Sequence, residues 1–193
     1  MKPVFAIRNA GFNFQEFSFP ITSLMALAPA SIDQKQLMKF NYHNLSLASW
    51  WPENVTAEFK QIPDKEAAPV PDICEWRGAS LVLSSRAYEC LIALLDSAGE
   101  FLPITANGQT YYLFNCLTFG QIDEINSKQD IQNGVFMGVI NVRFNSIDIA
   151  DKAVFKTPFD RCATVFCDDR LKTLVKTNKL TGIEFRDDLA DSL

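Results

Sequence analysis

An Asn-Gly pair at 107–108 lies between two extended segments, 100–105 (Glu-Phe-Leu-Pro-Ile-Thr) and 110–118. Asn-Gly is the sequence that a two-residue β-hairpin turn prefers, because both central residues need positive φ. The pair therefore predicts an antiparallel hairpin in the middle of the chain. Successive side chains of a strand point to opposite faces, so Asn115 and Cys116 cannot act as close catalytic partners.

A helix is expected immediately before this hairpin, at about 84–98. Apolar side chains there recur at helical spacing, and Ser84 or Ser85 can accept hydrogen bonds from the first free N–H groups. Gly99 follows where a left-handed residue commonly ends a helix. The segment therefore predicts a helix with one apolar face.

A second helix is expected at about 169–178, where Asp168 or Asp169 can cap its first turn. Elsewhere the extended segments come in runs and the helices come singly, without regular strand–helix alternation. This order predicts an α+β fold, with a mostly antiparallel sheet and two main helices.

The segment 63–72 contains three prolines and reads as a loop. It separates an N-terminal part, 1–62, which we expect to be β-rich, from a C-terminal α+β part, 73–193. We expect the two parts to form one compact unit.

The composition excludes several classes of protein. The net charge is −5 and the pI is about 4.9, so a generally basic nucleic-acid surface is absent. The chain has five cysteines without a Cys-x-x-Cys pair, which argues against a disulfide framework and a zinc site. No apolar run is long enough for a signal peptide or a spanning helix, so we expect a cytoplasmic protein without cofactors.

Few residues are suited to catalysis. His43 is the single histidine, so a Ser-His-Asp triad or a Cys-His pair would have to use it. No phosphate-binding or dinucleotide-binding glycine motif is present. The adjacent acidic pairs point apart in a strand or a helix, so they are weak evidence for a two-carboxylate site. A small hydrolase or transferase that uses carboxylates, or a cysteine with His43, stays as the alternative function.

A set of short motifs occurs in a fixed order over most of the chain, from about residue 50 to 186. The motifs are Trp51-Pro52, 71–73, 81–86, 99–104, 111–116, 122–127 and 180–185. In this order they resemble a family of bacterial immunity proteins from polymorphic toxin systems, family eleven. The sequence departs from the family pattern after Ser127 and over 145–160, which leaves the toxin undetermined.

The resemblance implies a protein without catalytic residues that binds a cognate toxin, which a neighbouring gene can encode, and neutralises it. A secretion-system accessory, which binds an effector without neutralising it, is a further interpretation. The sequence does not distinguish it from an immunity protein, because the two differ only in whether the bound toxin stays active. The motif residues suit caps, turns and strand edges, and we expect structural roles for Asp72, Ser84, Glu100, Pro103, Tyr112, Asn115, Asp123 and Ser127.

Loops are the expected contact surface, since they tolerate variation on a rigid scaffold. The two loops that we select are 61–72 and 127–134. Trp50 is added because aromatic side chains anchor interfaces. The candidate partner contacts are therefore Trp50, Asp64, Glu66, Lys128 and Asp130.

Overall fold

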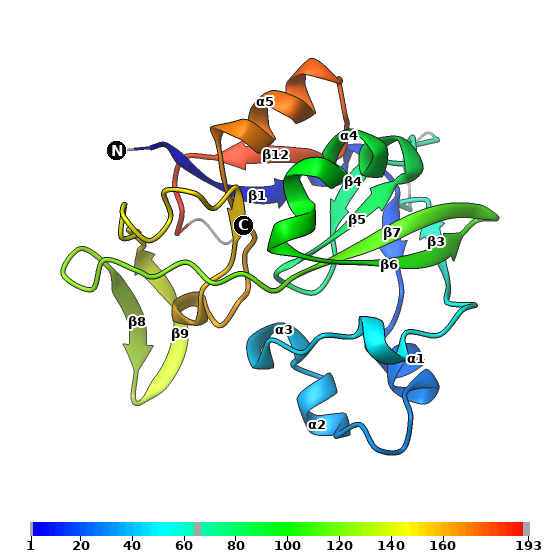
Figure 1. Cartoon of the computed structure of the whole chain (residues 1–193), viewed down its shortest axis with the longest axis horizontal. Helices are drawn as coiled ribbons and strands as arrows, with labels where there is room; N and C mark the ends of the chain where they lie inside the picture. Colours follow the sequence, from blue (N-terminus) through cyan, green and yellow to red (C-terminus); the bar gives the residue numbers. More distant parts are fainter. Residues whose placement is uncertain (1, 64–66, 191–193) are drawn as a thin grey trace.

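The computed structural model describes residues 2–63 and 67–190, whose strands form three sheets (Figure 1). Over these residues the neighbouring strands of the largest sheet run antiparallel, except that β3 and β6 are parallel. The predicted α+β class is confirmed. The strands of this six-stranded sheet are, in spatial order, β2 (Glu16–Ser18), β3 (Thr56–Lys60), β6 (Gly99–Ala106), β7 (Gln109–Cys116), β5 (Ser80–Ser84) and β4 (Ile73–Glu75).

The predicted hairpin is the centre of this sheet. Asn107 and Gly108 have φ of 49° and 77°, as the Asn-Gly turn requires, and β6 pairs with β7 along its whole length. In β7, Leu113 packs into one apolar cluster and Phe114 into another, on opposite faces of the sheet. The strand is therefore buried on both faces.

The helix before the hairpin is confirmed as α4 (Ser85–Leu95), extended by the 3-10 turn η3 (Asp96–Ala98). The Ser84 side chain caps it by accepting a hydrogen bond from the N–H of Ala87 at 3.2 Å. The left-handed cap at Gly99 is wrong, because this residue is extended, with φ −177°. Gly99 instead begins β6, where a Cβ would lie 2.2 Å from the carbonyl oxygen of Asn115.

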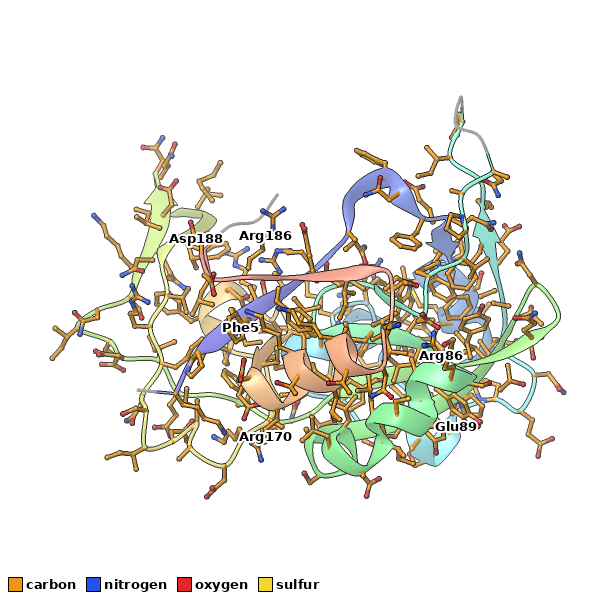
Figure 2. All side chains as sticks on the ribbon, turned by 90° about the horizontal axis from the view of Figure 1, so that it is seen from above. Phe5, Arg86, Glu89, Arg170, Arg186 and Asp188 are labelled. Atoms are coloured by element: carbon orange, nitrogen blue, oxygen red, sulfur yellow. The ribbon has the colours of Figure 1, made fainter. Side chains whose placement is uncertain are left out.

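A second sheet carries the other main helix, α5 (Asp169–Thr177), whose cap is Asp168: its carboxylate accepts from the N–H of Arg170 at 2.8 Å. Figure 2 shows α5 beside α4, where Arg86 donates a hydrogen bond to the carbonyl of Asn178, just beyond α5. The strands of this four-stranded sheet are β10 (Val154–Phe155), β11 (Phe166–Asp168), β1 (Val4–Asn9) and β12 (Ile183–Arg186).

Short helices cover the opposite face of the large sheet from α4. Their buried side chains, including Leu24, Leu37 and Phe40, pack on Leu102 and Leu113. The first strand, β1, pairs with β11 and β12 from the other end of the chain. The division of the chain into the parts 1–62 and 73–193 stays a prediction. The remaining elements before β3 are η1 (Gly11–Asn13), α1 (Ile21–Leu27), α2 (Gln34–Leu37), α3 (Phe40–His43) and η2 (Ala48–Trp50).

The third sheet is a separate hairpin of two strands, β8 (Lys128–Gln132) and β9 (Val135–Asn141). It projects from the body at the lower left of Figure 1, close to the 3-10 turn η4 (Pro158–Asp160). A third apolar cluster, which includes Phe144, Phe155 and Phe166, packs against Val139 of β9 at the base of the hairpin.

Candidate interaction surface

Two motif residues join the start of α4 to the chain before β12. Asp72 accepts hydrogen bonds from the N–H and the hydroxyl of Thr181, both at 3.0 Å. Its other carboxylate oxygen accepts from the hydroxyl of Ser84 at 3.2 Å, and Arg86 lies 3.3 Å away. These contacts lie within the fold, so they support the structural roles that we propose for Asp72 and Ser84.

Three further motif residues bind the segment that follows α3. Glu100 accepts from the N–H of Leu47 at 2.6 Å, and the amide of Asn115 donates to the carbonyl of Leu45 at 2.9 Å. The Pro103 carbonyl accepts from the Trp51 indole N–H at 2.8 Å. The Trp-Pro motif and the β6–β7 motifs, which are far apart in sequence, therefore meet in space.

The remaining motif residues occupy a strand face and a turn. The Tyr112 ring stacks on Tyr88, with ring centroids 3.8 Å apart. Asp123 accepts from the side chain of Asn126 at 2.8 Å, and this bond holds the pKa of the Asp123 carboxyl below its ordinary value. The hydroxyl of Ser127 both donates to and accepts from the backbone of Arg143, at 3.0 and 2.9 Å, which fixes the entry to β8.

The candidate partner contacts that the structure describes fall at two places. Trp50 is half-buried beside Trp51, with ring centroids 6.4 Å apart. Asp64 and Glu66 lie outside the described residues. Lys128 and Asp130 lie on β8.

The predicted loop 127–134 is wrong, because most of it is strand β8 and the turn into β9. Asn133 and Gly134 have φ of 52° and 78°, the same turn that joins β6 to β7. The sequence carried this Asn-Gly signal. Two register shifts interrupt the pairing of β8 with β9, and such bulges break the apolar–polar alternation that marks a strand.

Exposed apolar side chains gather on and around this hairpin. Of the eleven large apolar side chains that are exposed in the described residues, six lie between residues 125 and 147. Exposed apolar side chains that are concentrated on one element, and not scattered singly over the surface, indicate an interaction site. The hairpin side chains that are more than half exposed are Ile131, Val135, Met137 and Ile140.

Polar contacts hold the base of the hairpin to the body. The side-chain amide of Gln129 donates to the carbonyl of Phe159 at 2.6 Å, and that of Asn141 to the carbonyl of Asn126 at 2.7 Å. The Arg161 guanidinium lies 4.2 Å from the centroid of the Phe136 ring. The hairpin is therefore attached along one side and presents the rest of its surface outward.

A cleft of about 670 Å³ opens next to Arg161. One wall is α3 with the residues just before it, and the other is formed by two turns in which Arg77 and Arg161 have φ of 50° and 60°. The turns touch each other: a Cβ on Gly78 would lie 2.6 Å from the carbonyl oxygen of Cys162. The lining residues are Met38, Lys39, Phe40, Asn41, Tyr42, Arg77, Gly78, Arg161, Cys162 and Ala163.

The geometry does not favour the alternative enzyme. His43 is exposed on α3, whereas four of the five cysteines are buried. Burial raises the pKa of the Cys116 thiol to about 11 and that of Cys162 to about 12, so these groups stay protonated thiols. In the part of the chain that the structure describes, no group of three or more His, Cys, Asp or Glu residues could hold a metal ion.

Glu75 is a half-buried carboxylate with a raised pKa. Glu75 borders a second cavity, of about 390 Å³, and burial raises its pKa to about 7, although Arg8 lies 3.8 Å away. Glu75 and Asn9 also exchange hydrogen bonds, from the N–H of each to the side chain of the other, at 2.7 and 3.0 Å. These contacts join β4 to β1, so Glu75 connects the two larger sheets.

Comparison with known protein families gives a match over most of the chain. A family model described as "Immunity protein family (Imm11)" matches residues 21–189. No curated protein matches the chain. The helices of residues 2–63 and 67–190 are too short or too polar to cross a membrane.

Proposed function

The chain belongs to the Imm11 family of immunity proteins, and from this premise we propose that it binds and neutralises its cognate toxin through the β8–β9 hairpin. The family match carries the function, and the apolar surface of the hairpin carries the place of contact. The protein acts without catalysis, by covering the toxin in the cytoplasm of the cell that makes both.

The hairpin suits this role by its position and its side chains. Four of its apolar residues, Ile131, Val135, Met137 and Ile140, are more than half exposed, and they project from a body whose own apolar side chains form buried clusters. A few well-placed apolar or aromatic side chains carry most of the free energy of a protein interface, with polar residues around them. Lys128 and Asp130 lie on the same hairpin and would form part of that polar rim.

The net charge of −5 supports binding to a toxin with a basic surface, since opposite charges speed association. Toxins that act on nucleic acids commonly carry such a surface. This long-range attraction concerns the rate of encounter, whereas the hairpin would determine how long the complex lasts.

The function is tested by co-expression with the toxin encoded beside it. We expect the toxin alone to stop growth, and the two proteins together to restore growth and to purify as a complex. A neighbouring protein that is harmless alone, or that stays lethal in the presence of this protein, would overturn the proposal. A stable complex that leaves the toxin active would identify the accessory role instead.

The place of contact is tested by the double variant Val135→Lys/Met137→Lys. Both side chains are exposed, so the fold should stay intact, whereas binding should weaken by about 2 kcal/mol or more, roughly thirtyfold in Kd. The matched control is Leu27→Lys, which places a charge on an exposed apolar residue of α1, outside the hairpin. Equal affinities for the wild type and the double variant would exclude the hairpin as the contact surface.

A further inference from the structure

The cleft beside the hairpin carries a second inference, which rests on the proposed function. We propose that this cleft binds a short acidic segment of the toxin, with a carboxylate against Lys39, Arg77 and Arg161 and an apolar side chain against Met38 and Tyr42. The cleft would then determine which toxin is bound, whereas the neighbouring hairpin would supply apolar contacts.

The charges of the cleft support an anionic ligand. Lys39, Arg77 and Arg161 are exposed, and no ion pair joins any of them to a carboxylate within residues 2–63 and 67–190. No aspartate or glutamate is among the lining residues, although the whole protein is acidic. Two guanidinium groups can each present paired N–H donors to one carboxylate.

The cleft is also rigid, because a buried residue ties its walls together. Asn41 is 7% exposed, and its side chain donates to the carbonyl of Arg77 and accepts from the hydroxyl of Ser80 at 3.1 Å. Its backbone carbonyl accepts a 2.8 Å hydrogen bond from the ammonium group of Lys156, which is fully buried. A site held in this way loses little conformational freedom when a ligand binds.

The apolar residues of the cleft support the second part of the proposal, an apolar side chain on the bound segment. Met38 and Tyr42 line the cleft and are 47% and 48% exposed, so each offers apolar surface to a ligand. Arg161 also contacts Phe136 on β9, so the cleft and the hairpin share a wall. One partner can therefore cover both without a gap.

A protein segment fits this site better than a nucleic acid does. A polynucleotide is bound by a basic groove that follows its backbone, whereas here three cations line one open cleft on a protein of net charge −5. The rest of the surface would repel a long polyanion. The cleft thus selects a compact anionic group that a protein side chain can insert.

The first experiment measures the affinity of the purified toxin for the double variant Lys39→Gln/Arg77→Gln. We expect Kd to rise roughly 10–100-fold at low salt, and this difference from the wild type to shrink as salt is added. The matched control is Lys176→Gln, which removes an exposed lysine from α5, on the side of the molecule away from α3 (Figure 1). Thermal unfolding of each variant checks that the fold is kept.

The second experiment identifies the group that the cleft binds. A water-soluble carbodiimide joins an amine to a carboxylate in direct contact, so it should link Lys39 to an aspartate or glutamate of the toxin, and the link should be absent in Lys39→Gln. Competition with a single-stranded oligonucleotide and with inorganic phosphate provides the other probes. Displacement of the toxin from the cleft by the oligonucleotide, or no link at Lys39, would overturn the acidic-segment proposal.

The outcomes separate this inference from the proposed function. If the hairpin variant loses the toxin while Lys39→Gln/Arg77→Gln binds it like the wild type, the cleft proposal fails and the immunity function stands. If the protein does not bind the toxin at all, the proposed function fails first. Loss of affinity in both variants, together with the Lys39 link, supports both.

Discussion

Asn115 donates a 2.8 Å hydrogen bond from its side-chain amide to the carboxylate of Glu100, directly across the β6–β7 pair. Glu100 also accepts from Ser46 at 2.7 Å and from the N–H of Leu47 at 2.6 Å. Two side chains of the central hairpin thus hold the chain that follows α3. Because α3 is one wall of the cationic cleft, the pair positions that wall as well as stabilising the fold.

Glu100→Ala should destabilise the protein by about 2–4 kcal/mol, because it leaves the N–H of Leu47 and the amide of Asn115 without their carboxylate. Chemical denaturation measures this change. The control is Glu58→Ala, whose side chain is exposed beside Lys60 and should change stability by less than about 0.5 kcal/mol. Equal effects of the two variants would mean that the Glu100 contacts contribute nothing measurable.

Gly182→Ala tests a close approach between β4 and the start of β12. Gly182 has φ +105°, and a Cβ there would lie 2.1 Å from the carbonyl oxygen of Ile73, so we expect a loss of about 4 kcal/mol or failure to fold. Gly134→Ala is the matched control: its φ is +78° but nothing lies within 4 Å, and it should cost only about 1–2 kcal/mol. Melting temperatures that fall equally would show that the backbone yields at Gly182.

Local sequence patterns predicted the elements that depend on near neighbours. The Asn107–Gly108 turn, the Ser84 cap and the Asp168 cap each follow from a few consecutive residues. The left-handed cap predicted at Gly99 is wrong. A glycine is needed there because the carbonyl of Asn115 lies close, and only the pairing of β6 with β7 brings that carbonyl near. Signals that depend on such a distant partner cannot be recognised from spacing alone.

The proposed interaction surface is harder to predict for the same reason. The sequence indicated Lys128 and Asp130 as contacts, but it placed them in a loop because bulges disturb the alternation of β8 and β9. The cleft could not be predicted, since Arg77 and Arg161 meet only when two distant turns pack together. Four-residue helices such as α3 are too short to show helical periodicity.

The stability of the protein should depend on pH through Glu75. Burial raises the pKa of this carboxyl from 4.5 to about 7, so between these pH values the folded state binds more protons than the unfolded state. Stability from this group therefore falls as pH rises from about 4.5 to about 7, by about 1–3 kcal/mol. The measurement is the free energy of unfolding of the wild type minus that of Glu75→Gln, across this range.

The control for this measurement is Glu124→Gln, which makes the same replacement at an exposed carboxylate. A difference for Glu75→Gln that grows with pH would contradict the prediction. It would show that the attraction to Arg8, 3.8 Å away, outweighs the cost of burying the carboxylate.

Hydrogen exchange should distinguish the two hairpins in the free protein. The β6–β7 pair is flanked by β3 and β5 and is covered on both faces, whereas β8 and β9 pair only with each other in the described structure and expose apolar side chains. A two-stranded hairpin is marginally stable alone, so we expect the N–H groups of 129–140 to exchange much faster than those of β7. Addition of the toxin should slow exchange in the hairpin most, because binding covers it and removes its opened states. Exchange that stays fast in the complex would place the contact elsewhere, whereas protection that extends to 38–42 and 161–163 would indicate that the cleft is filled by the same partner.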